Sequence, residues 1–241
     1  MAQRMTRTHF TPSTTSSTAS STLVRLLTEL ASTEIADSKQ SFAERLSLWL
    51  DWSDAISLSA ALNGASAPTP PHALSGVSPP ASAISDEFAR VRADLVKSIT
   101  TDDLFTVATD NAMDFSPYRR QYLAHQRAMA ERIGPLRVNV RAALSKRSPS
   151  LSRLAALDAV LDEALSTRER HLLSHVTPML EKRFKHLRKS HLETMAETQE
   201  TDWWPTYRKD MQRVLLAELD MRLQPIEGMM EAMGHEATRQ Q

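Results

Sequence analysis

Two histidines four positions apart have a spacing that suits metal chemistry. The stretch HLLSH places His171 and His175 one helical turn apart, as in helical metal-chelating pairs. The zinc-protease helix also needs a glutamate beside its first histidine as general base, and Leu172 stands there instead. His186 and His191 follow on the same predicted helix, but His186 lies about 16 Å from His175 along the axis. The four cannot converge on one ion, so we expect solvated histidines and no metal site.

Paired acidic residues are the next candidates for catalysis. Asp102 and Asp103 lie together in SITTDDLF, and Asp51 and Asp54 flank Trp52. The first pair predicts a helix cap and first turn, and the second a solvated helix edge. The chain has no cysteine, no phosphate-binding glycine loop and no Gly-x-Ser-x-Gly elbow. We therefore predict no enzyme, no catalytic residue, no cofactor and no small-molecule substrate.

A dense basic stretch stands out in a chain whose formal net charge is zero. The candidate basic surface in EKRFKHLRKSHLE consists of Lys182, Arg183, Lys185, Arg188 and Lys189. Residues 1–116 hold 8 basic and 13 acidic side chains, residues 117–191 hold 16 and 6, and residues 192–241 hold 5 and 10. Charge is therefore segregated by segment.

Three uses of this positive charge are open. The blocks can pair within the protein or with a protein partner, at no more than about 1 kcal/mol for each exposed contact. The alternatives are nucleic acid, bound through residues 117–191, and an anionic membrane surface. Aromatic side chains for base stacking are missing from the basic stretch except Phe184, which belongs to an apolar stripe. We favour protein over nucleic acid, and nucleic acid over membrane.

Tryptophans and methionines mark a candidate protein interface. Trp203 and Trp204 precede a proline at a predicted break between helices, where we expect one ring to be exposed or bound to a partner. Met229, Met230 and Met233 follow near the C-terminus, and flexible apolar side chains suit adaptable surfaces, although a methionine stripe also suits a core.

Apolar periodicity predicts helices in the first third of the chain. Ser21 and Thr22 form a capping signal before leucines at helical spacing. A second helix is predicted to end at Asn63-Gly64. Its stripe consists of Phe42, Leu46, Trp49, Ser53, Ile56 and Ala60. This pattern predicts that Trp49 lies in the core.

Longer helices are predicted after a proline-rich segment. A cap at Ser85 precedes the stripe Phe88, Val91, Leu95 and Ile99. Ser116-Pro117 starts a helix that Gly134-Pro135 should break or kink. Ser148-Pro149 marks a turn before a periodic stretch over 151–195, with a kink expected at Pro178. A last helix is predicted from Pro205 to Leu223, followed by Pro225 and a methionine-rich turn.

These elements predict an all-α protein, a bundle of long amphipathic helices. We divide it into a disordered tail over 1–20, a helical pair over 21–63, a Pro/Ala/Ser-rich linker over 64–84 and a main bundle over 85–241. The helical pair is too small for its own core, so it should dock on the rest. The first 28 residues hold three arginines and no acid, which also suits an organelle transit peptide.

Two stretches show a family resemblance. FAERLSLWLDWSDAISLSAAL and DMQRVLLAELDMRLQPIEGMMEAM resemble an uncharacterised bacterial family, domain of unknown function 3348, over nearly the whole chain. Its motifs are structural, so no active-site residue is carried over. The family's occurrence beside peptidoglycan-binding, motor-stator-like envelope proteins implies a cytoplasmic accessory of an envelope complex. A bacterial source would exclude the transit peptide.

We therefore expect a cytoplasmic, non-enzymatic scaffold or accessory subunit that binds a protein partner or forms a homo-oligomer. No apolar run approaches the ~18 residues of a membrane span. A nucleic-acid-binding regulator that uses residues 117–191 is the alternative. The two differ in salt response, because phosphate contacts weaken steeply with salt and an apolar interface does not.

Overall fold

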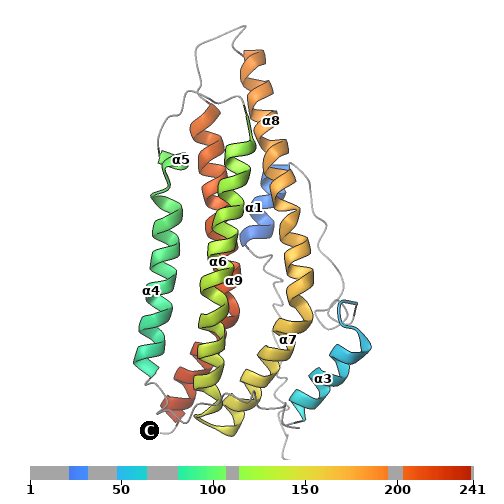
Figure 1. Cartoon of the computed structure of the whole chain (residues 1–241), viewed down its shortest axis with the longest axis vertical. Coiled ribbons are helices and arrows are strands. Elements are labelled where there is room, and N and C mark those ends of the chain that lie inside the picture. Colours follow the sequence, from blue (N-terminus) through green and yellow to red (C-terminus); the bar gives the residue numbers. More distant parts are fainter. Residues whose placement is uncertain (1–21, 32–47, 64–80, 107–113, 195–202, 240–241) are drawn as a thin grey trace, which may run out of the picture.

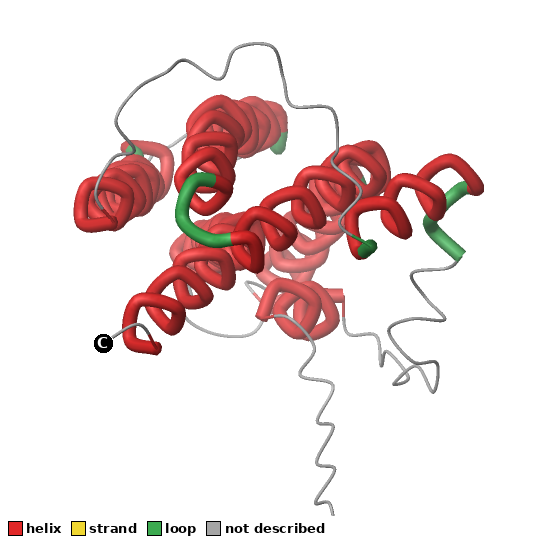
Figure 2. Tube along the Cα trace, turned by 90° about the horizontal axis from the view of Figure 1, so that it is seen from below, coloured by secondary structure: helices red, strands yellow, loops and turns green. Residues whose placement is uncertain are grey.

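The computed structural model describes residues 22–31, 48–63, 81–106, 114–194 and 203–239. Within these ranges all regular structure is helical and no strand occurs (Figure 2), which confirms the all-α prediction. The helices are α1 (Thr22–Ala31), α3 (Trp52–Leu62), α4 (Ala81–Thr100), α5 (Asp103–Thr106), α6 (Ser116–Ser145), α7 (Pro149–Ser174), α8 (Val176–Thr194) and α9 (Trp203–Arg239). The predicted tail over 1–20 and most of the linker over 64–84 lie outside the described residues.

The long helices run along one axis of the molecule (Figure 1). α6 descends beside α9, and α7 and α8 return in the opposite direction. α9 packs against α1, α4, α5, α6, α7 and α8, so it is the central element of the bundle. The two N-terminal helices dock on this bundle as expected, α1 on α8 and α9, and α3 on α7.

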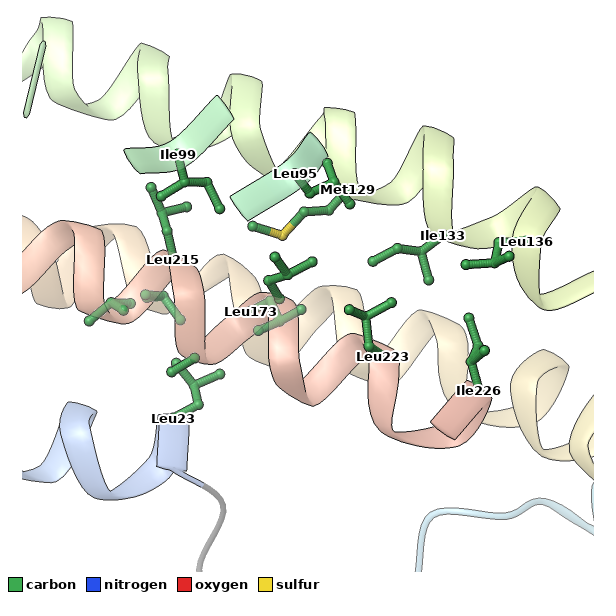
Figure 3. Close-up of a cluster of buried hydrophobic side chains, with 14 of the residues drawn as sticks. Leu23, Leu95, Ile99, Met129, Ile133, Leu136, Leu173, Leu215, Leu223 and Ile226 are labelled. Carbon is green, nitrogen blue, oxygen red and sulfur yellow. The ribbon is translucent and has the colours of Figure 1, made fainter. Parts of the chain in front are cut away.

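The core lies where α9 faces its neighbours. Figure 3 shows apolar side chains from α1, α4, α6, α7 and α9 pointing toward one another. The predicted stripes supply much of it: Leu95 and Ile99 of α4, and Met129 and Val140 of α6, are buried. Burial of such side chains contributes about 1.5–3 kcal/mol each relative to exposure. The period of the apolar residues therefore located the inward faces of α4 and α6 correctly, whereas the predicted stripe of the second helix is wrong at Ile56, which is 55% exposed.

α6 starts where predicted but is not broken. Asp114 accepts a hydrogen bond from the backbone N–H of Ser116, and this bond lowers the pKa of the Asp114 carboxyl. The helix continues through Pro135 to Ser145, so Gly134-Pro135 does not break it, and of the predicted break or kink only the kink stays a prediction. Proline removes one backbone hydrogen bond. Ile133 and Leu136 beside it are buried in the core, and this packing holds the helix together.

The predicted long stretch over 151–195 is two helices. Ser148 caps α7, and its hydroxyl accepts a hydrogen bond from Leu151 N–H. α7 ends at Ser174 and α8 begins at Val176, so the interruption lies at His175 and not at Pro178. The physical reason is still Pro178, because a proline lacks the N–H that would pair with the carbonyl four residues earlier, that of Ser174.

Two predicted helix starts are shifted. α3 begins at Trp52 because Asp51 and Asp54 form a capping box, in which each carboxylate accepts the other residue's backbone N–H. The predicted helix therefore does not run through Trp49, whose side chain is 40% exposed, so its assignment to the core is wrong. The part of that helix before residue 48 lies outside the described residues. α4 begins at Ala81, before the predicted cap at Ser85.

α9 is longer than predicted at both ends. It spans 37 residues and includes Trp203-Trp204 at its start and Pro225 in its interior. The buried side chains of Leu223 and Ile226 on either side of Pro225 anchor the helix where the proline removes a hydrogen bond. The predicted methionine-rich turn is therefore a continuation of this helix.

Candidate functional site

The basic stretch of α8 is partly neutralised within the protein. Arg183 turns toward α9, where its Nε lies 3.0 Å from the Asp210 carboxylate, and its side chain is 22% exposed. Lys185 Nζ lies 2.7 Å from Glu181 on the same helix. Arg183 is thus a contact between helices and is not presented to solvent with the lysines.

The other members of the predicted basic surface lie further out. Lys182 and Lys189 are exposed, and Arg188 is half-buried. Lys189 Nζ is 3.7 Å from Glu193, one helical turn away. The structure therefore leaves a weak cationic surface here, formed by lysines on the outer side of α8.

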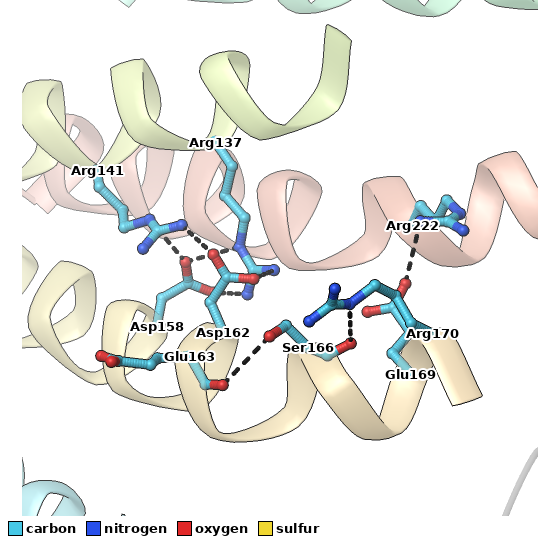
Figure 4. Close-up of polar contacts among 9 residues, drawn as sticks. All are labelled: Arg137, Arg141, Asp158, Asp162, Glu163, Ser166, Glu169, Arg170 and Arg222. Atoms are coloured by element: carbon cyan, nitrogen blue, oxygen red, sulfur yellow. Dashed lines mark hydrogen bonds and ion pairs between the residues drawn. The ribbon is translucent and has the colours of Figure 1, made fainter. Parts of the chain in front are cut away.

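Two arginines and two aspartates form a cluster between α6 and α7 (Figure 4). Arg137 lies 2.6 Å from Asp158 and 2.7 Å from Asp162, and Arg141 lies 2.5 Å from Asp162. Burial opposes the charge of Arg137, but its hydrogen bond to Asp158 and the two carboxylate charges outweigh it and raise its pKa. All four residues belong to the basic segment 117–191, so part of its charge is compensated inside the segment itself.

The charge blocks also pair with one another. Arg132 of α6 lies 2.6 Å from Asp94 of α4, and Arg92 of α4 lies 3.1 Å from Asp220 of α9. These pairs are 43–55% exposed, so each contributes little, up to about 1 kcal/mol. The Arg132–Asp94 pair joins the basic segment 117–191 to the acidic segment 1–116, as expected for pairing within the bundle, whereas Arg92–Asp220 joins the two acidic segments.

Trp203 and Trp204 both pack onto an aromatic cluster. Their rings stack on each other with centroids 4.4 Å apart and planes at 14°. Phe184 of α8 meets Trp203 edge-on at 5.2 Å, and Tyr118 of α6 lies 5.2 Å from Trp204. Both tryptophans are half-buried, so neither ring is fully exposed, and contact of one ring with a partner stays a prediction. Stacking lets two adjacent rings share one side of the helix start.

The methionines of the predicted interface lie mainly in the core. Met229 and Met233 are 2% and 4% exposed, and Met230 is half-buried against the core. Of the two roles predicted for the methionines, surface or core, Met229 and Met233 therefore have the core role. They present no surface to a partner. The predicted interface at Trp203, Trp204 and the methionines is in this structure a set of packing contacts.

The two histidines of HLLSH lie beside each other on the surface. The rings of His171 and His175 are 4.8 Å apart and nearly perpendicular. Nδ1 of His175 is 2.8 Å from the His171 carbonyl oxygen. The remaining ring nitrogens are therefore not arranged to bind one metal ion together. No group of three His, Asp or Glu side chains among the described residues is placed to hold a metal ion.

A buried polar centre that sequence reasoning missed lies at the corner between α4 and α5. Asp102 accepts the N–H of Leu104 at 2.9 Å, which confirms its predicted capping role. Its other oxygen lies 2.7 Å from His125 Nε2 and also accepts a hydrogen bond from the Gln121 amide. Phe105 stacks on the His125 ring with centroids 6.2 Å apart. The centre ties α6 to the α4–α5 corner.

A second missed centre surrounds Glu218 of α9, which is fully buried. Its carboxylate accepts hydrogen bonds from the Tyr122 hydroxyl at 2.5 Å, the Gln126 amide at 3.0 Å and Arg222 at 2.9 Å. Arg222 also lies 3.3 Å from Glu169 of α7. Burial first, and then the charge of Glu218, raise the pKa of Tyr122 far above its usual value. The Glu218 carboxylate therefore joins α9 to α6, and Arg222 extends the centre to α7.

Exposed apolar side chains concentrate around α3. We call this the α3 patch, and it consists of Leu48, Trp49, Trp52, Ile56 and Leu62. Trp52 is 82% exposed, and Ala61 is the one buried residue of α3. Arg168 of α7 stacks over Trp49 at 5.3 Å from the ring centroid, a cation–π contact that anchors the edge of the patch.

A groove lies between α6, the junction of α7 with α8, and α9. We call it the arginine groove; its volume is about 510 Å³. Arg119 and Arg127 of α6, Arg170 of α7 and Arg222 of α9 line it, together with Glu181. It shares no residue with the α3 patch, and its lining residue Arg222 binds the buried Glu218.

No helix in the described parts of the chain combines the length and apolarity needed to cross a membrane. Comparison with curated proteins gave no match, and comparison with solved structures gave none either. The family model described as "Protein of unknown function (DUF3348)" matches residues 1–235. The resemblance seen in the sequence is thereby confirmed, and the chain belongs to the DUF3348 family.

Proposed function

We propose that the protein is a non-enzymatic interaction protein that binds a protein partner through the α3 patch. The observation behind this proposal is the concentration of large exposed apolar side chains on one short helix. Scattered apolar residues are normal on a protein surface, but five large exposed apolar side chains on and directly before one short helix, two of them tryptophans, are typical of a binding site. The partner would present an apolar surface of its own, with a helix face as the simplest form.

The way α3 is attached supports this function. Among the helices described, α3 packs mainly on α7, at the edge of the bundle (Figure 1). Its capping box holds the helix start without help from a partner. Trp52 and Ile56 are therefore held on a formed helix while they point away from the core, and their burial against a partner would remove apolar area from water.

The interaction surface differs from the one that the sequence favoured. Trp203 and Trp204 are engaged with Phe184 and Tyr118, whereas Trp52 is 82% exposed. We propose that the protein acts in the cytoplasm as an accessory subunit of an envelope complex, as the family resemblance implies. A bacterial envelope assembly is therefore the first place to seek the partner, with a second copy of the chain as the other possibility.

The nucleic-acid alternative receives less support. A polynucleotide surface needs many cations free to contact phosphates along one face. Arg137 and Arg141 are bound to aspartates, and Arg183 is bound to Asp210. The segment 117–191 therefore has fewer available cations than its sequence suggests.

Site-specific photo-crosslinking tests the α3 patch. A photoreactive residue at Ser59, on the same face of α3 as Trp52 and Ile56, should give a discrete adduct in cells. Trp52→Glu with Ile56→Glu should abolish that adduct, because each glutamate places a charge in an apolar contact. The matched control is Val138→Glu with Leu192→Glu, which alters equally exposed apolar residues elsewhere and should leave the adduct intact.

The outcomes separate the alternatives. Crosslinking of the purified protein to itself would assign the patch to a homo-oligomer, and a heterologous adduct would assign it to another protein. An adduct that persists in the Trp52→Glu, Ile56→Glu variant, or none at all in the parent, would refute the proposal. Thermal unfolding of each variant checks that the bundle is intact.

A further inference from the structure

We propose that the arginine groove binds a small molecule that bears phosphate groups. This site is independent of the α3 patch and goes beyond the function proposed above. Arg119 and Arg127 extend from α6, Arg170 from α7 and Arg222 from α9, so three helices contribute cations to one concave surface. A concave surface lined by charges of one sign concentrates oppositely charged solutes.

The charges of the groove are not all compensated by the protein. Arg222 is neutralised by the buried Glu218 and by Glu169. Arg119 and Arg127, in contrast, make no ion pair with any other residue that the structure describes. The groove therefore holds cations that an anionic ligand would satisfy.

Arg170 and Glu181 do not remove the excess of positive charge in the groove. Arg170 donates to the Ser166 carbonyl and to the Thr167 hydroxyl, neither of which carries a charge (Figure 4 shows the first contact). Glu181, the acid in the groove lining, lies 2.7 Å from Lys185 on the outer side of α8. Three arginines thus remain without a carboxylate, which favours a multiply charged anion over a single carboxylate.

The register of the helices brings two of these arginines to the same level. α6 and α7 run in opposite directions, and Arg137 pairs with Asp158 and Asp162. Arg127 lies ten residues before Arg137, and Arg170 lies a similar distance after the aspartates, so the two lie at a similar level of the bundle, and both line the groove. Planar guanidinium groups on opposite sides can hold a phosphate by paired hydrogen bonds.

A buried hydroxyl group at the groove is a second observation that points to a ligand. Thr177, in the first turn of α8, lines the groove and is 8% exposed. Its Oγ1 has no hydrogen-bond partner among the described residues. A buried hydroxyl without a partner is unfavourable, and such groups in native proteins call for an explanation. A phosphate oxygen in the groove would supply the acceptor.

The remaining lining suits the body of a small molecule. Leu123, Leu173 and Pro178 form an apolar wall beside the arginines. The volume of about 510 Å³ lies within the range of small-molecule sites, about 300–1,000 Å³, and exceeds the needs of a single phosphate ion. We therefore expect a ligand with phosphates at the arginines and a less polar part against this wall, as in a nucleotide.

Isothermal titration calorimetry at low salt, with pyrophosphate and with ATP as probes, tests the groove. Arg127→Gln combined with Arg170→Gln should weaken binding at least about tenfold, because hydrogen bonds between charged groups are lost. The matched control, Arg147→Gln with Arg153→Gln, removes two exposed arginines near the far end of α6 and should stay within about twofold. Thr177→Val should weaken binding by a smaller factor. All altered arginines are exposed, so the variants should fold, and thermal unfolding checks this.

The possible results show which part of the ligand the groove contacts, or that the groove is not its site. Tighter binding of ATP than of pyrophosphate would show that the apolar wall contacts the ligand body, and equal binding would restrict the site to the phosphates. Absence of binding for both probes at about 1 mM would overturn the proposal. So would equal losses in the two arginine pairs, which indicate diffuse attraction. A DNA duplex that binds through Arg127 and Arg170 while neither probe does would replace it with a polynucleotide site.

Discussion

α9 and α3 use apolar residues in opposite ways. α9 spans 37 residues, contacts six other helices and buries even a glutamate. α3 spans 11 residues, rests mainly on α7 and leaves a tryptophan 82% exposed. α9 is rich in charged residues and forms the core, whereas α3 is the more apolar helix and lies outside it. Position in the bundle, and not apolar content, decides which helix stabilises the fold.

The contrast separates stability from recognition. The central helix packs against six neighbours, so a change on its buried faces alters packing or leaves a polar group unpaired. The peripheral helix has apolar side chains that remain exposed beside the helices that the structure describes. We therefore expect substitutions in α9 to change the free energy of unfolding, and those in the α3 patch to change binding.

The largest effect should come from truncation of a buried leucine. Leu219→Ala in α9 should lower the free energy of unfolding by about 2–5 kcal/mol, because a fully buried side chain leaves a cavity. Ile56→Ala in the α3 patch should change it by only about 0.5 kcal/mol, because that side chain is 55% exposed. Urea unfolding measures both. Similar losses in the two variants would show that α3 belongs to the core.

A smaller effect is expected from the buried carboxylate. Glu218→Gln keeps the volume but removes the charge that accepts hydrogen bonds from Tyr122 and Arg222, so it should cost about 2–3 kcal/mol. Glu231→Gln, at an exposed position of the same helix, serves as control and should stay within about 0.5 kcal/mol. A neutral result for Glu218→Gln would mean that its hydrogen bonds are matched by solvent in the unfolded chain.

The smallest effect concerns acid and the start of α3. The Asp54 backbone N–H, and then the Ser53 hydroxyl, lower the pKa of Asp51 below its usual 3.8. A group whose pKa is lowered by folding stabilises the fold above its unfolded pKa and loses that effect as pH falls through the folded pKa. The Asp54 amide shift, followed by NMR, should therefore show an acid step below about pH 4.

Two variants examine the origin of that step. Asp51→Asn should abolish it at the Asp54 amide. Asp114→Asn, at the start of α6, should leave it unchanged, although Asp114 also has a lowered pKa. A step that survives Asp51→Asn would assign the titration to another carboxylate near α3.

Local patterns predicted the helices but not how they meet. Apolar spacing identified the inward faces of α4 and α6, and Ser116-Pro117 and Ser148-Pro149 marked helix starts. Proline positions were misjudged, because packing around Pro135 and Pro225 outweighs the loss of a hydrogen bond. Apolar periodicity shows which face of a single helix is apolar and contains no information about how that face packs on other helices.

The polar centres could not be found from sequence for a related reason. Asp102 and His125 are 23 positions apart, and Tyr122 and Glu218 are 96 apart, so neither pair forms a motif. The arginine groove likewise combines three helices. The segregation of charge along the chain predicted ion pairs between segments. It did not predict that Arg137 would pair with aspartates of its own basic segment, 117–191.

The order of the helices along the chain has a consequence for synthesis. α9 comes after every other described helix, yet α1, α4, α5, α6, α7 and α8 all pack on it. A growing chain therefore holds its earlier helices without their common partner until residues 203–239 have left the ribosome. Until then their inward faces remain exposed to water and to other chains. A premature stop before Trp203 would make that state permanent and yield a substrate for chaperones and proteases.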